Sequence, residues 1–206
     1  MEQKNIPAAD IQKFKHLNFQ AFQDLAQDDS LSPYQKIGFP DAYRKGKEQA
    51  IFEDILQKMP AFQTQGAKVL DIGCGCSELV ELIIAHSQQH KQTLLLNDGK
   101  AMLDLLPEQA HITKIEGYFP DQTTPMLDKL QGQIDAIITY SVFHYVFEEG
   151  NIFQFLDNCV RLLAPGGQLL VGDIPNVSKR KRFFCKRQRD KISSKLYPNR
   201  YPPACV

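Results

Sequence analysis

The sequence predicts an α/β fold built on a doubly wound, mostly parallel sheet of five strands, with helices on both faces. From residue 67 onward, short apolar strands alternate with amphipathic helices, which is the pattern of consecutive βαβ units. The first of these strands breaks into a glycine-rich turn, VLDIGCGCS at residues 69–77, which leads into a helix. The 206 residues match the length of one such domain with a sizeable buried core.

The region before this sheet, residues 1–60, is expected to form a helical cap that packs on the core. A first helix follows Asp10, a suitable N-cap, and a second begins at Asp41. The first helix carries apolar residues at near-helical spacing: Ile11, Phe14, Leu17, Phe22 and Leu25. The second helix carries Ile51, Phe52, Ile55 and Leu56 on one face.

Residues 61–184 are expected to form the ligand-binding domain. The pattern predicts strands at about 67–72, 93–97, 111–116, 134–139 and 167–173, with helices near 77–88, 99–105, 121–131 and 150–163. The turn Pro165-Gly166-Gly167 separates the last helix from the fifth strand. Because crossovers are right-handed and the strand order reverses early, we expect a ligand-binding crevice at the carboxyl ends of strands one and four.

The glycine turn at residues 69–77 distinguishes between three kinds of ligand site. A phosphate-binding P-loop needs four residues between its glycines and then Gly-Lys-Ser/Thr, which this turn lacks. A dinucleotide fingerprint needs a third glycine at position 78, where Glu78 would repel a pyrophosphate. The remaining pattern, an acidic residue followed by x-Gly-x-Gly, resembles motif I of the class I S-adenosylmethionine (SAM) methyltransferases, and Asp71, Gly73 and Gly75 match it. A strand-to-helix turn without a ligand is the alternative.

This resemblance, over about residues 36–184, implies a Rossmann-like, SAM-binding domain and the transfer of a methyl group. It also implies a carboxylate after the second strand that binds the ribose hydroxyls of SAM, and Asp98 matches that position. A carboxylate at a strand end suits this role because it accepts two O–H hydrogen bonds at once. Asn97, one residue earlier, is an alternative candidate, and Asp98 serving only as the N-cap of the next helix is another.

Two more strand ends carry candidate pocket residues. After the third strand, Tyr118 stands where many members of the family have an acid that binds the adenine amino group. Stacking of the adenine on Tyr118 or Phe119 is the expected substitute, with Phe119 as a core residue the alternative. After the fourth strand, a resemblance to motif IV implies that Tyr140 and Ser141 line the SAM pocket.

His144 and Arg44 complete the candidate site. His144 is the only histidine near the predicted crevice, and an imidazole is a suitable general base near neutral pH. A hydrogen-bonded structural role is the alternative for His144. The resemblance implies an N-terminal helix over the cofactor with an arginine on the SAM carboxylate. Arg44 suits this role because its planar guanidinium pairs bidentately with carboxylates, and a solvated helix residue is the alternative.

Composition argues against several classes of protein. Hydrophobic residues make up 43% of the chain and charged residues 23%, average values for a soluble globular protein. No apolar run approaches the roughly 20 residues that span a membrane, and the first residues, MEQK, do not resemble a signal peptide. The five cysteines lack a C-x-x-C spacing, so neither a disulfide framework nor a metal site is expected. These features predict a cytoplasmic protein without a membrane partner.

Charge is unevenly distributed along the chain. Residues 1–177 carry 14 Lys and Arg against 23 Asp and Glu, whereas residues 178–206 carry 10 against 1. The basic end also lacks the alternating pattern of the two further strands with which the family normally finishes. Residues 185–206 are therefore expected to be a basic tail, disordered or left by truncation or replacement of that ending, which adds no sixth strand.

The expected function is SAM-dependent methylation of a small-molecule acceptor on oxygen or nitrogen. The segments IGFPDAYR, GYFPDQ and GDIPNVSKRKRFF resemble a bacterial group tied to surface-sugar biosynthesis, which implies a sugar-related acceptor. One alternative is a nucleic-acid methyltransferase whose basic tail binds phosphates, although the acidic body and the absence of an Asn/Asp-Pro-Pro-Tyr/Phe motif argue against it. A degenerate SAM-binding domain without activity is the other alternative.

Overall fold

The computed structural model describes residues 17–123, 125 and 128–175 of the chain. The described residues up to Asp173 belong to one compact unit, and Ile174 begins a second unit, of which only residues 174 and 175 are described. The predicted N-cap at Asp10 and the predicted tail at residues 185–206 lie outside the described residues. Within the described part of the chain, no helix is long and apolar enough to cross a membrane.

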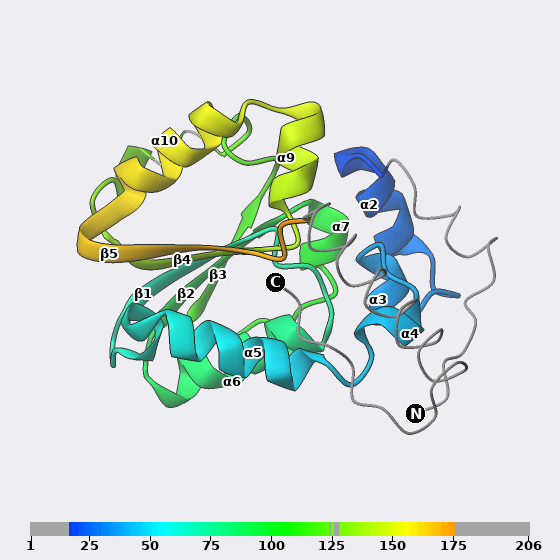
Figure 1. Cartoon of the computed structure of the whole chain (residues 1–206), viewed down its shortest axis with the longest axis horizontal. Coiled ribbons are helices and arrows are strands. Elements are labelled where there is room, and N and C mark those ends of the chain that lie inside the picture. Colours follow the sequence, from blue (N-terminus) through cyan, green and yellow to red (C-terminus); the bar gives the residue numbers. More distant parts are fainter. Residues whose placement is uncertain (1–16, 124, 126–127, 176–206) are drawn as a thin grey trace, which may run out of the picture. The chain divides into compact units, whose positions relative to one another are not determined.

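Parallel strands form one sheet, as the sequence predicts (Figure 1). In the described residues the strands are β1 (Lys68–Ile72), β2 (Thr93–Asp98), β3 (Ile112–Glu116), β4 (Ile134–Tyr140) and β5 (Leu163–Gly172). Their spatial order is β3-β2-β1-β4-β5, so strand addition reverses between β1 and β4. Asp71 lies opposite Leu96 of β2 and Ile138 of β4, next to this reversal. The topology therefore confirms the predicted fold class and places a crevice at the carboxyl ends of these strands.

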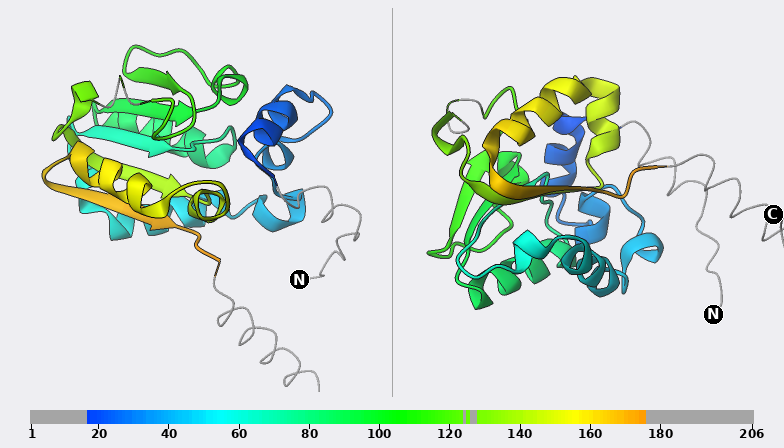
Figure 2. Two further views of the ribbon diagram at one scale, coloured as in Figure 1. Left: turned by 90° about the horizontal axis from the view of Figure 1, so that it is seen from above. Right: turned by 60° about the vertical axis from the view of Figure 1, so that its left-hand side comes forward.

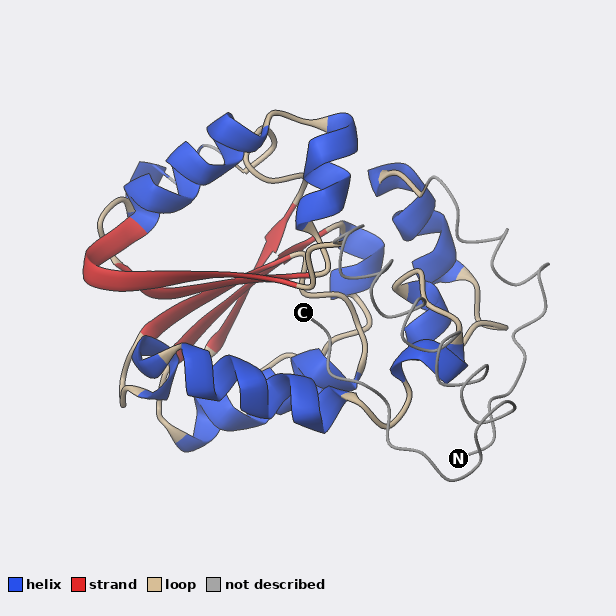
Figure 3. Ribbon diagram, viewed as in Figure 1, coloured by secondary structure: helices blue, strands red, loops and turns tan. Residues whose placement is uncertain are grey.

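Helices cover both faces of the sheet (Figure 3). The helices α5 (Glu48–Lys58) and α6 (Glu78–Gln89) pack on one face, and α9 (Phe143–Glu149) and α10 (Ile152–Leu162) pack on the other. Because successive strand residues point to opposite faces, the neighbours Val69 and Leu70 belong to different core clusters. Ile55 of α5 and Phe155 of α10 are 0% and 1% exposed, and burying each side chain stabilises the fold by roughly 1.5–3 kcal/mol.

Short helices of the N-terminal region lie beyond the carboxyl ends of the strands (Figure 2). They are α2 (Phe19–Gln27), α3 (Pro33–Lys36) and α4 (Asp41–Arg44). The Asn18 side chain caps α2, and a capping box between Ser32 and Gln35 starts α3. Gln23 of α2 accepts a hydrogen bond at 2.9 Å from the backbone N–H of Ala101 in α7 (Lys100–Leu103). This bond fixes α2 to the end of the second βα unit.

The helix predicted to begin at Asp41 is interrupted. It forms as α4 and α5, which are separated by residues 45–47. Gly46 between them has a φ of +77°, a left-handed conformation that ends the first helix. The second helix therefore begins only at Glu48, buries Phe52 and Ile55 as predicted, and is followed by a 3-10 helix, η1 (Pro60–Gln63).

Element boundaries near the fifth strand also differ from the prediction. The strand begins at Leu163, so Pro165-Gly166-Gly167 lies inside it, and the pairing with β4 shifts register between Ile134 and Ala136. The predicted helix over 150–163 forms as α10, and a separate helix, α9, precedes it. The range 121–131, predicted as a helix, contains a 3-10 helix, η2 (Asp128–Leu130), while residues 124, 126 and 127 are not described.

Candidate functional site

A cavity lies at the carboxyl ends of the strands, beneath α2, with an empty volume of about 1030 Å³ that includes open solvent. It is bounded by the β1–α6 turn, the ends of β2, β3 and β4, the start of α9 and the N-terminal helices. Eight of the nine predicted site residues line it: Arg44, Asp71, Gly73, Gly75, Asp98, Tyr118, Tyr140 and Ser141. The ninth, His144, does not line it. The fold thus gathers residues from five separate stretches of sequence around one space.

The glycines of the β1–α6 turn are required by both backbone conformation and packing. Gly73 and Gly75 have φ values of +70° and +63°, where side chains are disfavoured. A Cβ on Gly73 would lie 2.4 Å from Cγ2 of Val142, and one on Gly75 would lie 2.7 Å from Cγ2 of Ile37. The turn is therefore packed between the end of β4 and the N-terminal region, with its backbone facing the cavity.

Asp98 joins this turn to the end of β2. Its Oδ2 accepts a hydrogen bond from the Gly75 N–H at 2.9 Å, and its Oδ1 accepts one from the Gly99 N–H at 2.7 Å. Burial raises the pKa of the Asp98 carboxyl to about 6, although these two bonds act in the opposite direction. Each oxygen retains a lone pair for a further donor, so the carboxylate is held in place and still able to bind a ligand.

Asn97, the alternative candidate at this position, is bonded elsewhere. Its side-chain Nδ2 donates to the backbone oxygens of Ile115 at 2.8 Å and Gly117 at 2.9 Å, and the residue is 2% exposed. Its own backbone oxygen accepts from the Gly73 N–H at 2.8 Å. Asn97 therefore positions β3 and the glycine turn, which leaves Asp98 as the stronger candidate for contact with a ligand.

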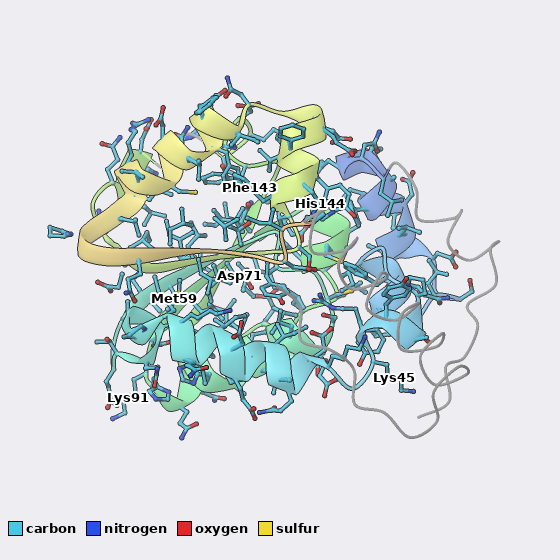
Figure 4. The ribbon with its side chains drawn as sticks, viewed as in Figure 1. Lys45, Met59, Asp71, Lys91, Phe143 and His144 are labelled. Atoms are coloured by element: carbon cyan, nitrogen blue, oxygen red, sulfur yellow. The ribbon has the colours of Figure 1, made fainter. Side chains whose placement is uncertain are left out.

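Asp71, labelled in Figure 4, is a buried carboxyl that lines the cavity. It is 3% exposed, and burial, with a smaller contribution from the Asp98 carboxylate, raises its pKa to about 8. No ion pair with a cation is formed by this carboxyl within the described residues. A cationic ligand in the cavity would lower this pKa and stabilise the ionised form, since opposite charges favour ionisation.

Arg44 borders another part of the cavity and is itself 6% exposed. Its Nε donates to Oε1 of the fully buried Glu48 at 3.1 Å. Its guanidinium lies 4.9 Å from the centroid of the Phe39 ring and 5.4 Å from that of Tyr140. The planar group is therefore held between aromatic rings and an acid, and it has more N–H donors than these contacts use.

Ser141 connects Arg44 to Asp173 at the end of β5. Its Oγ accepts from Nη1 of Arg44 at 3.2 Å and donates to Oδ2 of Asp173 at 2.6 Å. Nη1 of Arg44 also lies 3.6 Å from Oδ2 of Asp173. Ser141 and Asp173 have φ values of +61° and +55°, both in the left-handed region that side chains disfavour. The surrounding bonds hold both residues in this strained conformation.

Tyr118 and Phe119 lie beside aromatic residues from other elements. The Tyr118 ring meets the Phe19 ring edge-on at a centroid distance of 5.4 Å, and Phe119 meets Phe155 of α10 at 4.9 Å. Phe119 is 4% exposed and belongs to the core, the alternative that the sequence left open, although it also borders the cavity. The backbone N–H of Tyr118 donates to Oε1 of Gln122 at 2.8 Å, which fixes the loop after β3.

His144 lies on α9 (Figure 4) and does not line the cavity. Its ring packs on Tyr145 at a centroid distance of 3.9 Å, and its Nδ1 is buried without a hydrogen-bond partner in the described residues. Burial lowers the pKa of His144, while the negative charges of Asp173 and Glu148 raise it to a smaller extent. No group of three His, Cys, Asp or Glu side chains among the described residues could hold a metal ion.

Several cavity residues were not predicted. Phe19, Phe22 and Phe39 come from the N-terminal region, and Tyr145 and Glu149 come from α9. The α9 residues have a signal in the sequence, because positions 142, 145, 146 and 149 follow helical spacing and all line the cavity. The aromatic residues of the N-terminal region have no such periodic signal, because the resemblance implies a helix over the cofactor but does not indicate which side chains face it.

Comparison with known proteins gives a consistent result. Residues 70–169 match the family model described as a methyltransferase domain. The chain is 29% identical over 166 residues to the ribosomal RNA small subunit methyltransferase C of Hahella chejuensis, covering 79% of this chain and 46% of that protein. It is 27% identical over 124 residues to the ubiquinone biosynthesis O-methyltransferase of Caulobacter sp. (strain K31), covering 56% and 44%. The chain thus spans less than half the length of these curated relatives.

Among solved structures, a SAM-dependent methyltransferase from Aquifex aeolicus is similar with a TM-score of 0.47 and 19% identity, covering 68% of this chain and 71% of that one. A precorrin-6y C5,15-methyltransferase from Geobacter metallireducens is similar with a TM-score of 0.49 and 15% identity, covering 79% and 78%.

Proposed function

We propose that this chain, which belongs to the class I SAM-dependent methyltransferases, uses its cavity to bind SAM and methylates a small-molecule acceptor on oxygen or nitrogen. The observation that carries the proposal is the Asp98 carboxylate, which two backbone N–H groups fix at the cavity while each of its oxygens keeps a free lone pair. A carboxylate prepared in this way is suited to accept hydrogen bonds from both hydroxyls of a ribose.

The charges around the cavity fit this cofactor. Asp71, Asp98 and Glu149 contribute carboxylates to the lining, and Arg44 contributes a guanidinium. SAM carries a sulfonium and an ammonium, which suit the acids, and one carboxylate, which suits the arginine. We assign Asp98 to the ribose and Arg44 to the cofactor carboxylate, with Gly73, Gly75, Tyr140 and Ser141 forming the walls. When bound, SAM would supply a methyl group bonded to a sulfonium, and the neutral thioether S-adenosylhomocysteine would be the leaving group.

The protein contributes mainly position and charge to such a reaction. Rigid walls on β4 and the glycine turn hold the reactants in one orientation, and this accounts for much of the rate in bimolecular transfers. His144 remains the predicted base for an acceptor proton, since its lowered pKa keeps the imidazole neutral near pH 7. Because His144 lies outside the cavity wall, its role depends on an acceptor that reaches α9.

Calorimetry tests the proposed cofactor directly. We expect SAM and its demethylated product, S-adenosylhomocysteine, to bind the full chain with micromolar dissociation constants. The absence of binding heat at several temperatures, together with unchanged thermal stability at millimolar ligand, would refute the proposal.

The acceptor that we propose is a small, uncharged or cationic molecule. The similarity to an O-methyltransferase and the net negative charge of residues 1–177 support it. The segments that resemble proteins of surface-sugar biosynthesis suggest that the acceptor is related to a sugar.

RNA is the second candidate acceptor. A relative of this chain is named a ribosomal RNA methyltransferase, and residues 178–206 carry nine more basic than acidic residues. A filter-binding titration with RNA and DNA at several salt concentrations distinguishes the two candidates. A steep loss of affinity with salt that disappears on deletion of residues 178–206 would favour RNA, since released counterions produce that slope. Weak, salt-insensitive retention would favour the small molecule.

A further inference from the structure

The cavity has a distinct aromatic end, formed around the loop after β3. Gly117 follows β3 and donates its N–H to the backbone oxygen of Asp98 at 3.0 Å, so this end adjoins the proposed ribose carboxylate. Tyr118 and Phe19 form the edge-on pair there. Apolar side chains also line the cavity: Met102, Phe119, Val146 and Phe155. A flat, largely apolar heterocycle suits such surroundings.

Glu149 is the acidic side chain that borders this aromatic end. It lines the cavity from the last turn of α9, and its charge raises the pKa of Tyr118, after the larger effect of burial. Its Oε2 lies 3.4 Å from the backbone nitrogen of Phe19, at the outer limit of a hydrogen bond. No cation pairs with Glu149 in the described part of the chain. Its carboxylate therefore keeps most of its capacity to accept hydrogen bonds.

Two other polar groups at this end are already bonded. The backbone N–H of Tyr118 donates to Gln122, and the Asn97 amide donates to two backbone oxygens. The Tyr118 hydroxyl is buried against Gly150 without a partner in the described residues. Among the described residues, Glu149 thus contributes the carboxylate with free acceptor capacity beside a ring bound here.

We propose that Glu149 makes the cavity selective for a purine that carries an exocyclic amino group, by accepting a hydrogen bond from that group. This rests on the proposed function, in which the base of SAM occupies the aromatic end. Adenine has an amino group at C6 and can donate to the carboxylate. Hypoxanthine has a carbonyl oxygen at C6, which would face the carboxylate with two acceptors and no proton between them. Glu149 then supplies the carboxylate for the adenine amino group that the side chain of Tyr118 lacks.

The test compares S-adenosylhomocysteine with S-inosylhomocysteine, whose base has a carbonyl in place of the amino group at C6 and carries a proton on N1. Calorimetry gives both dissociation constants for the wild-type chain, for Glu149→Gln and for Glu148→Gln. Glu148 is the adjacent exposed acid that does not line the cavity, so it controls for loss of one negative charge. We expect the wild type and Glu148→Gln to prefer the adenosyl ligand by at least roughly tenfold, consistent with a charge-assisted hydrogen bond.

In Glu149→Gln the preference should fall to within about threefold, because a glutamine amide can either accept from an amino group or donate to a carbonyl. A variant that keeps the wild-type preference would overturn the inference, as would equal binding of both ligands by the wild type. If Glu149 only holds α2 through Phe19, its replacement weakens both ligands equally and leaves the ratio unchanged. If the wild type binds neither ligand, the proposed function itself fails, which is a separate result.

Discussion

Two carboxylates at the same edge of the sheet, Asp98 at the end of β2 and Asp173 just after β5, are held in different ways. Asp98 accepts hydrogen bonds from the backbone N–H groups of Gly75 and Gly99, which belong to adjoining βα turns. The Asp173 side chain is 45% exposed and is bonded through side chains, Ser141 directly and Arg44 at 3.6 Å. The first arrangement follows from the sheet itself, because the parallel strands β1 and β2 bring their turns together.

The second arrangement depends on a helix outside the sheet. Arg44 belongs to α4 of the N-terminal region, and both Ser141 and Asp173 adopt left-handed backbone conformations. Side chains from distant segments must meet before these conformations are stabilised. The comparison indicates that the β1–β2 side of the site is structurally fixed, whereas the β4–β5 side can be altered at less cost to the fold.

The largest effect on stability is expected at Gly73, which donates its N–H to the backbone oxygen of Asn97 in β2 and packs against Val142 after β4. Gly73→Ala places a Cβ 2.4 Å from Val142 at a φ of +70°, so the strain and the clash should lower the free energy of unfolding by roughly 2–4 kcal/mol. Urea denaturation measures this change. Gly66→Ala is the matched control, since Gly66 has a φ of +75° but nothing within 4 Å of its Cβ. Equal losses in the two variants would show that packing against Val142 contributes nothing.

Asp98 should dominate cofactor affinity. Asp98→Ala removes both the ribose acceptor and the bonds that fix the glycine turn, so we expect S-adenosylhomocysteine to bind more than tenfold more weakly, a loss above about 1.4 kcal/mol. Calorimetry measures this, with Asp104→Ala as a control because Asp104 is exposed and pairs with Lys100 on α7. An affinity within threefold of the wild type would remove Asp98 from the proposed site.

Asp71 should make stability depend on pH. Its pKa in the folded protein is about 8, above the ordinary value of 3.8, so the fold favours the protonated form. The contribution of Asp71 to the free energy of unfolding is therefore fully present below pH 3.8. It decreases between pH 3.8 and about 8, by up to about 1.4 kcal/mol per pH unit. Between pH 6 and 8, Asp71→Asn should flatten the curve measured by urea denaturation without ligand. Parallel curves for the two proteins would contradict the assignment.

The smallest effect is expected at Asp173. Asp173→Asn keeps an oxygen that accepts from Ser141 and loses only the charge near Arg44, so the free energy of unfolding should change by less than about 1 kcal/mol. Affinity for S-adenosylhomocysteine should stay within about twofold, because Asp173 does not line the cavity. A loss as large as that of Asp98→Ala would mean that the two sides of the site are equally fixed.

The parts of the molecule that the sequence predicts are those set by local or strand-to-strand geometry. The alternation of apolar strands with helices along the chain predicts the parallel sheet. Asp71, Asp98 and Ser141 lie at or near the ends of strands, and this position brings them to one cavity. The start of the fifth strand differs from the prediction because Leu163 already pairs with Ile134 before Pro165-Gly166-Gly167, and regular pairing resumes only at Gln168 opposite Ala136, so the turn residues form an irregularity within β5. The roles of these site residues stay predictions until ligand binding is measured.

Contacts between distant segments were not predictable in the same way. The bonds of Arg44 to Glu48 and Ser141, and the approach of Glu149 to Phe19, depend on how helices dock. Such docking cannot be predicted from a single sequence, because the pattern of an amphipathic helix indicates which of its faces is buried but not the surface that buries it. His144 illustrates the converse: its position after β4 is correct, yet the turn of α9 directs it away from the cavity.

The bond between Gln23 and Ala101 has a consequence for how the chain folds. Gly99, at the N-cap of α7, has no side chain to satisfy the first N–H groups of that helix, and Gln23, 78 residues before Ala101, supplies the acceptor for the Ala101 N–H. A Cβ on Gly99 would lie 1.7 Å from Nε2 of Gln23, so the space belongs to the incoming glutamine. As the ribosome synthesises the chain, α2 emerges long before its docking surface exists, and closing so long a loop carries an entropic cost. The bond that fixes α2 over the cavity therefore cannot form until the turn after β2 has been synthesised.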